Sequence, residues 1–165
     1  MLWGLSSRER ILRVLRPKGI TQVVGDLAEL PADASVLLVR GDYLFDTRVL
    51  QALADSANVL LRLAPSEHSL EVAAQVPARL APLVKTRLIN GKAAAPPPEG
   101  IGAVTPDLLC PAFQEHLLKS DPPFVLPISP ADRVRLERLL FGSAYKGITD
   151  LVTKWVWPAP ARGVT

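Results

Sequence analysis

Apolar residues along the first 128 positions form short continuous runs that alternate with helix-like spacings, and proline, glycine or aspartate separates them. Short continuous apolar runs predict strands that are buried on both faces of a sheet. The expected strands are residues 20–24, 36–39, 58–63, 101–104 and 124–128, whereas 72–76 suits either a strand or a helix. Strands of this kind are typical of parallel sheets, which helices cover on both sides.

Helices are expected between these strands. Ser6 and Glu9 have the spacing of a capping box at the start of the first helix. Asp46 can cap a second helix, and a third helix closes near Asn90. The alternation of strands and helices therefore predicts a three-layer α/β domain over residues 1–128, with a mainly parallel, Rossmann-like sheet in which the strand at 36–39 is central.

Residues 129–165 are expected to form a separate helical segment. One helix begins after Ser129 with an apolar stripe, and an amphipathic helix follows Gly142. The stripe of the first consists of Leu136, Leu139 and Leu140. The residues of the second that are expected to face a membrane are Ile148, Leu151, Val152, Trp155, Val156, Trp157, Lys146 and Lys154. Tryptophan and lysine beside an apolar stripe are typical of a helix in the headgroup layer, but such a stripe can also pack on the domain's own core.

Charge is unevenly distributed along the 165 residues, although the formal net charge is only +3. Residues 1–20 hold five basic and one acidic side chain, residues 130–165 hold six and three, and the middle holds eight and twelve. Basic ends suit a chain whose termini lie near anionic headgroups, but an ordinary solvated surface gives the same pattern. A single cysteine excludes an internal disulfide, and no run is long enough to span a bilayer, so we expect a soluble chain in a reducing compartment.

Residues 141–158 read Phe-Gly-Ser-Ala-Tyr-Lys-Gly-Ile-Thr-Asp-Leu-Val-Thr-Lys-Trp-Val-Trp-Pro and are followed by Pro-Ala-Arg at 160–162. This stretch resembles the juxtamembrane stretch of bacterial CDP-alcohol phosphatidyltransferases that carry an N-terminal cytoplasmic domain. In that family such a stretch leads into a transmembrane core that uses magnesium to transfer a phosphatidyl or phosphoalcohol group from a CDP-linked donor. The family's signature, Asp-Gly-x-x-Ala-Arg followed by Gly-x-x-x-Asp-x-x-x-Asp, does not occur in this chain. The resemblance therefore implies a transmembrane core beyond Thr165.

Residues 35–53 resemble the strand, Gly-Asp turn and helix of the nucleotidyltransferase-like domains that are fused ahead of such cores. The resemblance places Asp42 at the metal-binding aspartate, although a turn aspartate that accepts local amide hydrogen bonds is the alternative. The Gly-rich phosphate loop of active enzymes has no counterpart near Met1, and only Glu99 or Asp107 could supply a second carboxylate. These departures predict a degenerate domain with no catalytic residues and no cofactor of its own.

Other candidate residues indicate no site. His68 and His116 lack partners at metal-ligand spacing, and the arginines at 8, 10, 13 and 16 suit a solvated helix face or a phosphate contact. Nucleic-acid binding is not expected, because aromatic residues make up only 5% of the chain. We expect a non-catalytic accessory domain at the cytoplasmic face of the inner membrane, whose partners are anionic lipid and its own transmembrane core, with a homodimer as a further option. The alternatives are an active cytidylyltransferase-like enzyme and an unrelated membrane-docking module.

Overall fold

The computed structural model describes residues 4–63, 70–90, 96–110 and 122–140. The chain divides into two compact units, one formed mainly by Leu5–Pro127 and the other mainly by Ile128–Thr165. Each unit is described by itself below. The predicted membrane-facing residues between 146 and 157, like His68 and His116, lie outside the described residues.

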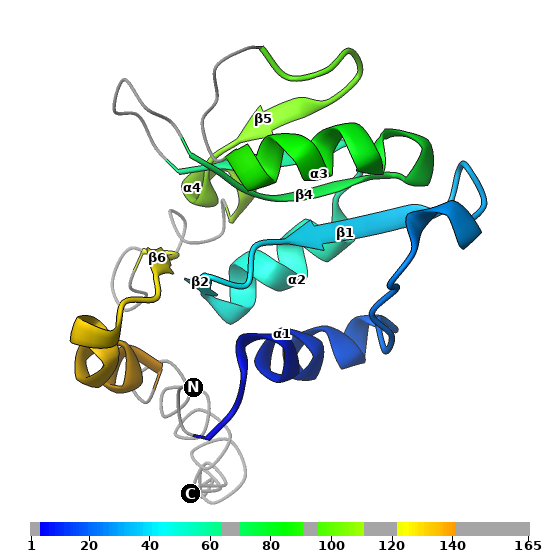
Figure 1. The fold of residues 1–165 in the computed structure, drawn as a ribbon. Coiled ribbons are helices and arrows are strands. Elements are labelled where there is room, and N and C mark those ends of the chain that lie inside the picture. The colour runs from blue at the N-terminus through cyan, green and yellow to red at the C-terminus, as the bar shows by residue number, and fades with distance from the viewer. Residues whose placement is uncertain (1–3, 64–69, 91–95, 111–121, 141–165) are drawn as a thin grey trace, which may run out of the picture. The chain divides into compact units, whose positions relative to one another are not determined.

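The first unit is built around a mixed four-stranded sheet with the strand order β1-β4-β3-β5 (Figure 1). Its strands are β1 (Ser35–Val39), β3 (Val59–Arg62), β4 (Glu71–Pro77) and β5 (Gly102–Val104). β4 pairs antiparallel with β1 and with β3, and only β3 and β5 pair in parallel. The α/β class is therefore confirmed, but the prediction of a mainly parallel sheet is wrong, and β1 lies at an edge rather than at the centre.

A short connection explains why the sheet is not parallel. Only residues 63–70 join β3 to β4, whereas a crossover between parallel strands needs about a dozen residues or more. β4 must therefore return beside β3 in the opposite direction. As a result β1, β3 and β5 share one direction, and their carboxyl ends meet the start of β4 at the same edge of the sheet.

The outer side of β1 has no strand partner among the described residues. Arg40 N donates to Val72 O, and Ala78 N donates to Ala34 O, at the two ends of the β1–β4 pairing. Because bonding alternates along an antiparallel pair, these two bonds place the even-numbered residues of β1 in the ladder with β4. The amides and carbonyls of Ser35, Leu37 and Val39 consequently point to the open side.

Helices begin where the capping residues predict. Among the described residues of the first unit, the helices are α1 (Ser7–Leu15), α2 (Thr47–Asp55), α3 (Ala81–Asn90) and α4 (Pro106–Leu109), with 3₁₀ turns η1 (Arg16–Lys18), η2 (Leu27–Glu29) and η3 (Ala78–Leu80). Ser6 and Glu9 form both bonds of the predicted capping box. The Asp46 carboxylate accepts from Arg48 N at 2.9 Å and caps α2, as expected. A separate antiparallel pair joins β2 (Tyr43–Phe45) to β6 (Val125–Pro127).

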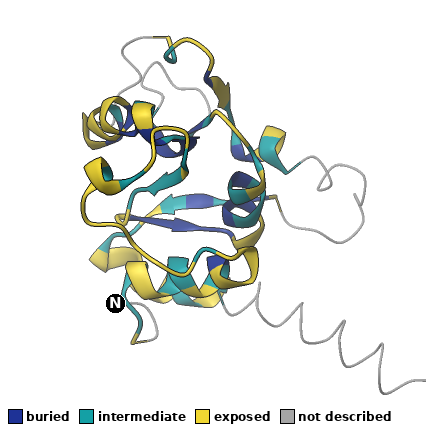
Figure 2. Cartoon of the chain, turned by 90° about the vertical axis from the view of Figure 1, so that its right-hand side faces the viewer, coloured by how far each residue is buried: buried dark blue, intermediate teal, exposed yellow. Residues whose placement is uncertain are grey.

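Two apolar clusters fill the two sides of the four-stranded sheet. Leu61 packs with Val49 and Leu53 of α2 on one side, where α1 also lies, and Leu60 packs with Val84 and Leu88 of α3 on the other. Neighbouring residues of β3 thus enter different clusters, as the alternation of a strand requires. Buried positions lie inside and exposed helix faces outside (Figure 2). The predicted arrangement of helices on both sides of a sheet is confirmed.

Residues 20–24 do not form the strand that their apolar pattern predicts. Val23 and Val24 are 51% and 43% exposed, and the segment runs without strand pairing from Ile20, which packs beside α1 and α2, to Leu27, which packs beside α3. The segment therefore passes from one side of the sheet to the other. Such a path prevents it from running alongside a strand.

In the second unit, η4 (Pro130–Asp132) leads into helical residues 133–140. The Ser129 hydroxyl accepts from Ala131 N at 3.3 Å, which confirms the predicted helix start. Leu136 is buried, but Leu139 is 37% exposed although the predicted stripe includes both. None of the helices in the part of the chain that the structure describes has the length and apolar character to cross a bilayer.

Candidate functional site

Five charged side chains occur around the edge where β1, β3 and β5 end and β4 begins. Arg40 and Asp42 follow β1, Arg62 ends β3, Glu71 starts β4, and Arg87 comes from α3. This edge is the place where Asp42 is expected from the sequence, directly after the strand. The arginines and carboxylates form two groups, one around Asp42 and one around Glu71.

Arg40 binds the Asp42 carboxylate through both oxygens. Its Nε lies 3.0 Å from Oδ1 and its Nη2 lies 2.5 Å from Oδ2, which is the bidentate arrangement. The Arg40 guanidinium also donates from Nη1 to Leu88 O at 3.1 Å and lies 5.0 Å from the centre of the Tyr43 ring. The hydrogen bonds from Arg40 hold the pKa of the Asp42 carboxyl below its usual value, although partial burial raises that pKa.

Glu71 is completely buried and is bound by two arginines. Arg87 donates to it from Nη2 at 2.7 Å and from Nε at 3.1 Å, and Arg62 donates from Nη2 at 3.0 Å. Burial by itself raises the pKa of the Glu71 carboxyl, but the bonds from Arg87 and Arg62 outweigh it and leave this pKa below its usual range. Arg87 also donates to Pro96 O at 2.8 Å. The group joins β3, β4, α3 and the segment that precedes β5.

The two groups have a consequence for metal binding at this edge. Mg²⁺ needs free carboxylate oxygens, usually from one or two acids together with substrate phosphates. Asp42 is exposed but bound at both oxygens, and Glu71 is bound at both oxygens and has no exposed surface. Across the described residues no three His, Cys, Asp or Glu side chains come together as a metal site. A metal at Asp42 would have to compete with Arg40 for the carboxylate.

The two acids proposed as further metal ligands lie on either side of β5. Glu99 is exposed in the turn before the strand, and Asp107 is exposed in the first turn of α4 after it. Neither forms an ion pair with a described residue. Since β5 separates them, Glu99 is at the start and Asp107 at the end of that strand. Only Asp107 comes from the end of the sheet that carries Asp42.

A third group of paired charges lies at the start of α2. Asp46 is buried, and besides capping the helix it binds Arg48 Nη2 at 2.6 Å and Nε at 3.1 Å. Cys110 follows α4, and burial, followed by the charge of Asp46, raises the pKa of its thiol. A raised pKa favours the protonated form of the thiol. Asp46 and Arg48 thus form a structural ion pair at the start of α2.

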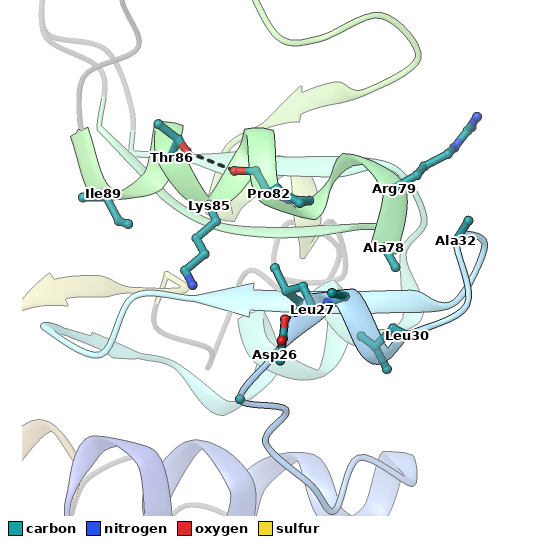
Figure 3. A pocket seen from close by; sticks show the side chains of 12 residues that line it. Asp26, Leu27, Leu30, Ala32, Ala78, Arg79, Pro82, Lys85, Thr86 and Ile89 are labelled. Carbon is teal, nitrogen blue, oxygen red and sulfur yellow. Dashed lines mark hydrogen bonds between the residues drawn. The ribbon is translucent and has the colours of Figure 1, made fainter.

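A groove of about 670 Å³ lies between η2 and α3 (Figure 3). Its lining includes Pro82, Lys85, Thr86 and Ile89 of α3, Ala78 and Arg79 of η3 directly before it, and opposite them Gly25, Asp26, Leu27, Ala28, Leu30 and Ala32. Figure 3 shows Lys85 directed into the groove and Arg79 directed away from it. The Thr86 hydroxyl donates to Pro82 O, and Asp26 Oδ1 accepts from Ala28 N. The groove thus offers apolar contact area with one amine inside it.

The arginine partners at the sheet edge escaped prediction from the sequence. Arg40 and Asp42 are two residues apart, a spacing that places both side chains on one side of an extended chain. Glu71 and Arg62 are each the only charge at the end of an apolar run, which is unusual unless the charge is paired. These two patterns were the available signals. Arg87 gave no signal of its own within its helix.

Comparison with known proteins gives no match: no family model, curated protein or solved structure is similar to this chain.

Proposed function

We propose that this chain is a non-catalytic accessory domain of a CDP-alcohol phosphatidyltransferase and works beside a transmembrane core at the cytoplasmic face of the inner membrane. The resemblance of residues 141–162 to the family's juxtamembrane stretch supports this assignment. An α/β unit with a Gly-Asp turn directly after a strand agrees with a nucleotidyltransferase-like origin. The domain's role is to dock or position the core, which performs the transfer with magnesium.

The observation that carries the non-catalytic role is the bidentate bond from Arg40 to Asp42. Nucleotidyl transfer needs a carboxylate that is free to hold Mg²⁺ against a triphosphate. Here a guanidinium occupies both oxygens of that carboxylate, and Arg40 is itself fixed by Leu88 O and the Tyr43 ring. Arg40 therefore competes with a metal cation for the Asp42 carboxylate.

Nucleotide titration tests this role. The purified chain is titrated with CTP, CDP and ATP in the presence of Mg²⁺, and bound nucleotide is measured by calorimetry. We expect no saturable binding and no release of pyrophosphate with a panel of sugar and polyol phosphates. Tight binding with turnover that Asp42→Asn abolishes and Asp55→Asn preserves would establish the active cytidylyltransferase instead. Asp55 is a suitable control because it is an exposed aspartate paired with Lys18.

The family assignment has its own test, which is independent of nucleotide binding. The coding region that follows Thr165 should encode transmembrane helices that carry the signature Asp-Gly-x-x-Ala-Arg and Gly-x-x-x-Asp-x-x-x-Asp. A reading frame that closes without them would overturn the assignment. The unrelated docking module would then be the better explanation.

Membrane contact through residues 146–157 is tested by flotation with anionic liposomes. The chain should float, and Trp155→Ser combined with Val152→Ser should remain in the unbound fraction, because these substitutions remove apolar side chains that enter the headgroup layer. A variant that floats as well as the original chain would remove the membrane role from this segment.

A further inference from the structure

The helical residues 133–140 present a face that the sequence pattern did not single out. Ala131, Val134, Arg135, Arg138 and Leu139 line a hollow of about 490 Å³. Pairs among them that are three or four residues apart are neighbours on one side of the helix. Leu136, which is 2% exposed, lies beside this side, three residues before Leu139. The helix is thus anchored by Leu136 and exposes a mixed apolar and basic face, which we call the 131–139 face.

The apolar members of the 131–139 face are open to solvent. Val134 is 62% exposed and Leu139 is 37% exposed. Single exposed Val and Leu side chains are ordinary on a protein surface, but here two arginines lie between them on the same side of the helix. Aliphatic parts of Arg side chains extend such an apolar surface while their charged ends remain in water.

Charge on this helix is arranged so that its free cations lie on the 131–139 face. Arg133 is bound to Glu137, with Nε 3.1 Å from Oε1, on another side of the helix. Arg135 and Arg138 have no ion pair with any described residue. Asp132 is the nearest acid, at the helix start, and it forms no ion pair with a described residue either. The face therefore carries a net positive charge.

We infer that the 131–139 face binds anionic phospholipid headgroups, as a second contact separate from residues 146–157. Guanidinium groups bind phosphate through two parallel hydrogen bonds, and Val134 and Leu139, which flank the two arginines, can enter the boundary of the acyl region. Arg135 and Arg138 make the face positively charged, which complements an anionic lipid surface. The inference rests on the proposed membrane-side location and adds residues to it.

The test uses the full chain and vesicles of equal parts phosphatidylglycerol and phosphatidylcholine, with pure phosphatidylcholine vesicles for comparison. Arg135→Gln with Arg138→Gln should lower the partition coefficient on anionic vesicles roughly tenfold or more, because each basic residue near such a surface contributes about a factor of five. Arg133→Gln is the matched control, since this arginine is already paired with Glu137. The control should change partitioning less than about threefold, and added salt should reduce the difference between the two variants.

Each outcome decides between the two membrane contacts. Loss of binding in the Arg135/Arg138 variant, with the control unaffected, supports the inference whether or not Trp155→Ser with Val152→Ser also loses binding. Unchanged binding of the Arg135/Arg138 variant, with loss in the Trp155/Val152 variant, overturns this inference and leaves the proposed function standing. If the original chain does not bind anionic vesicles, both fail. If sedimentation instead shows a dimer that Val134→Ser dissociates while vesicle binding persists, the face is an interface between copies and the inference is wrong.

Discussion

Replacing Glu71 with glutamine should cost about 2–3 kcal/mol of unfolding free energy. The substitution keeps the size of the side chain but removes its charge and one of its two acceptor oxygens, so that three hydrogen bonds from Arg62 and Arg87 lose their charged partner. Breaking a buried ion pair from one side costs about 3–5 kcal/mol. We reduce this figure because the side chains of Arg62 and Arg87 retain 20% and 18% exposure, so water can partly solvate them.

Urea unfolding followed by circular dichroism measures this loss. With a slope of about 2 kcal/mol per molar urea, the midpoint should fall by roughly 1–1.5 M. Glu99→Gln is the matched control, because Glu99 is an exposed acid of the same unit, and its midpoint should remain within about 0.25 M of the original. Combining Glu71→Gln with Arg87→Gln should cost less than the sum of the two single changes, since both remove the same contact. A midpoint shift below about 0.3 M for Glu71→Gln would refute the view that this group holds the sheet edge together.

Three further results are expected. The pKa of Glu71 in the folded state lies below its ordinary value of 4.5, so the unfolded state takes up the proton first as the pH falls. The stability that the ionised Glu71 contributes is therefore complete above about pH 5 and is lost as the pH falls through the folded pKa. This pH dependence should be missing in Glu71→Gln. Asp46→Ala should destabilise by about 2 kcal/mol in thermal unfolding and Asp46→Asn by less, because asparagine retains the cap and loses only the charge on Arg48; equal losses would contradict the capping role. Leu53→Ala should cost about 3–4 kcal/mol in urea unfolding, since Leu53 is fully buried, and a cost below 1.5 kcal/mol would mean that α2 is loosely packed.

Local chemistry made the helix starts predictable from the sequence. Ser6 with Glu9 and Asp46 each satisfy backbone amides within three residues, so no distant part of the chain is needed to recognise them. The position of Asp42 after β1 was also predictable locally, because Gly41 and Asp42 closely follow the apolar run at 36–39. The run at 58–63 and the run at 101–104 also became strands, β3 and β5, with boundaries shifted by at most one residue.

Strand direction could not be read from the apolar runs themselves. β4 is buried along almost its whole length, like a strand of a parallel sheet, because α2 and α3 cover both of its sides. The informative signal was the short connection from β3 to β4 rather than any side chain. The failure at 20–24 has a different cause, since a Val-rich segment that crosses between the two sides of a sheet has the composition of a strand but no neighbour to pair with.

The sequence predicted where the candidate site lies but not which group binds its carboxylate. A Gly-Asp turn after a strand indicates where a carboxylate will stand, but the sequence does not say whether a cation or a guanidinium will bind it. In this chain that difference depends on Arg40, which reaches Asp42, Tyr43 and the end of α3 at once. Asp42 and Tyr43 are close to Arg40 in the sequence, but Leu88 is 48 residues away and cannot be inferred from a local motif.

The open side of β1 has a consequence for amide hydrogen exchange. Every second amide of this strand, at Leu37 and Val39, points away from β4, while those of Val36 and Leu38 donate to it. Exchange of the first pair needs no opening of the sheet, whereas exchange of the second pair waits for β1 to separate from β4. Adjacent residues of one strand should therefore differ in protection by orders of magnitude. The strand carries no charge and no proline that would oppose pairing with another chain, so the same exposed amides make β1 the segment from which aggregation of a partly unfolded chain would begin.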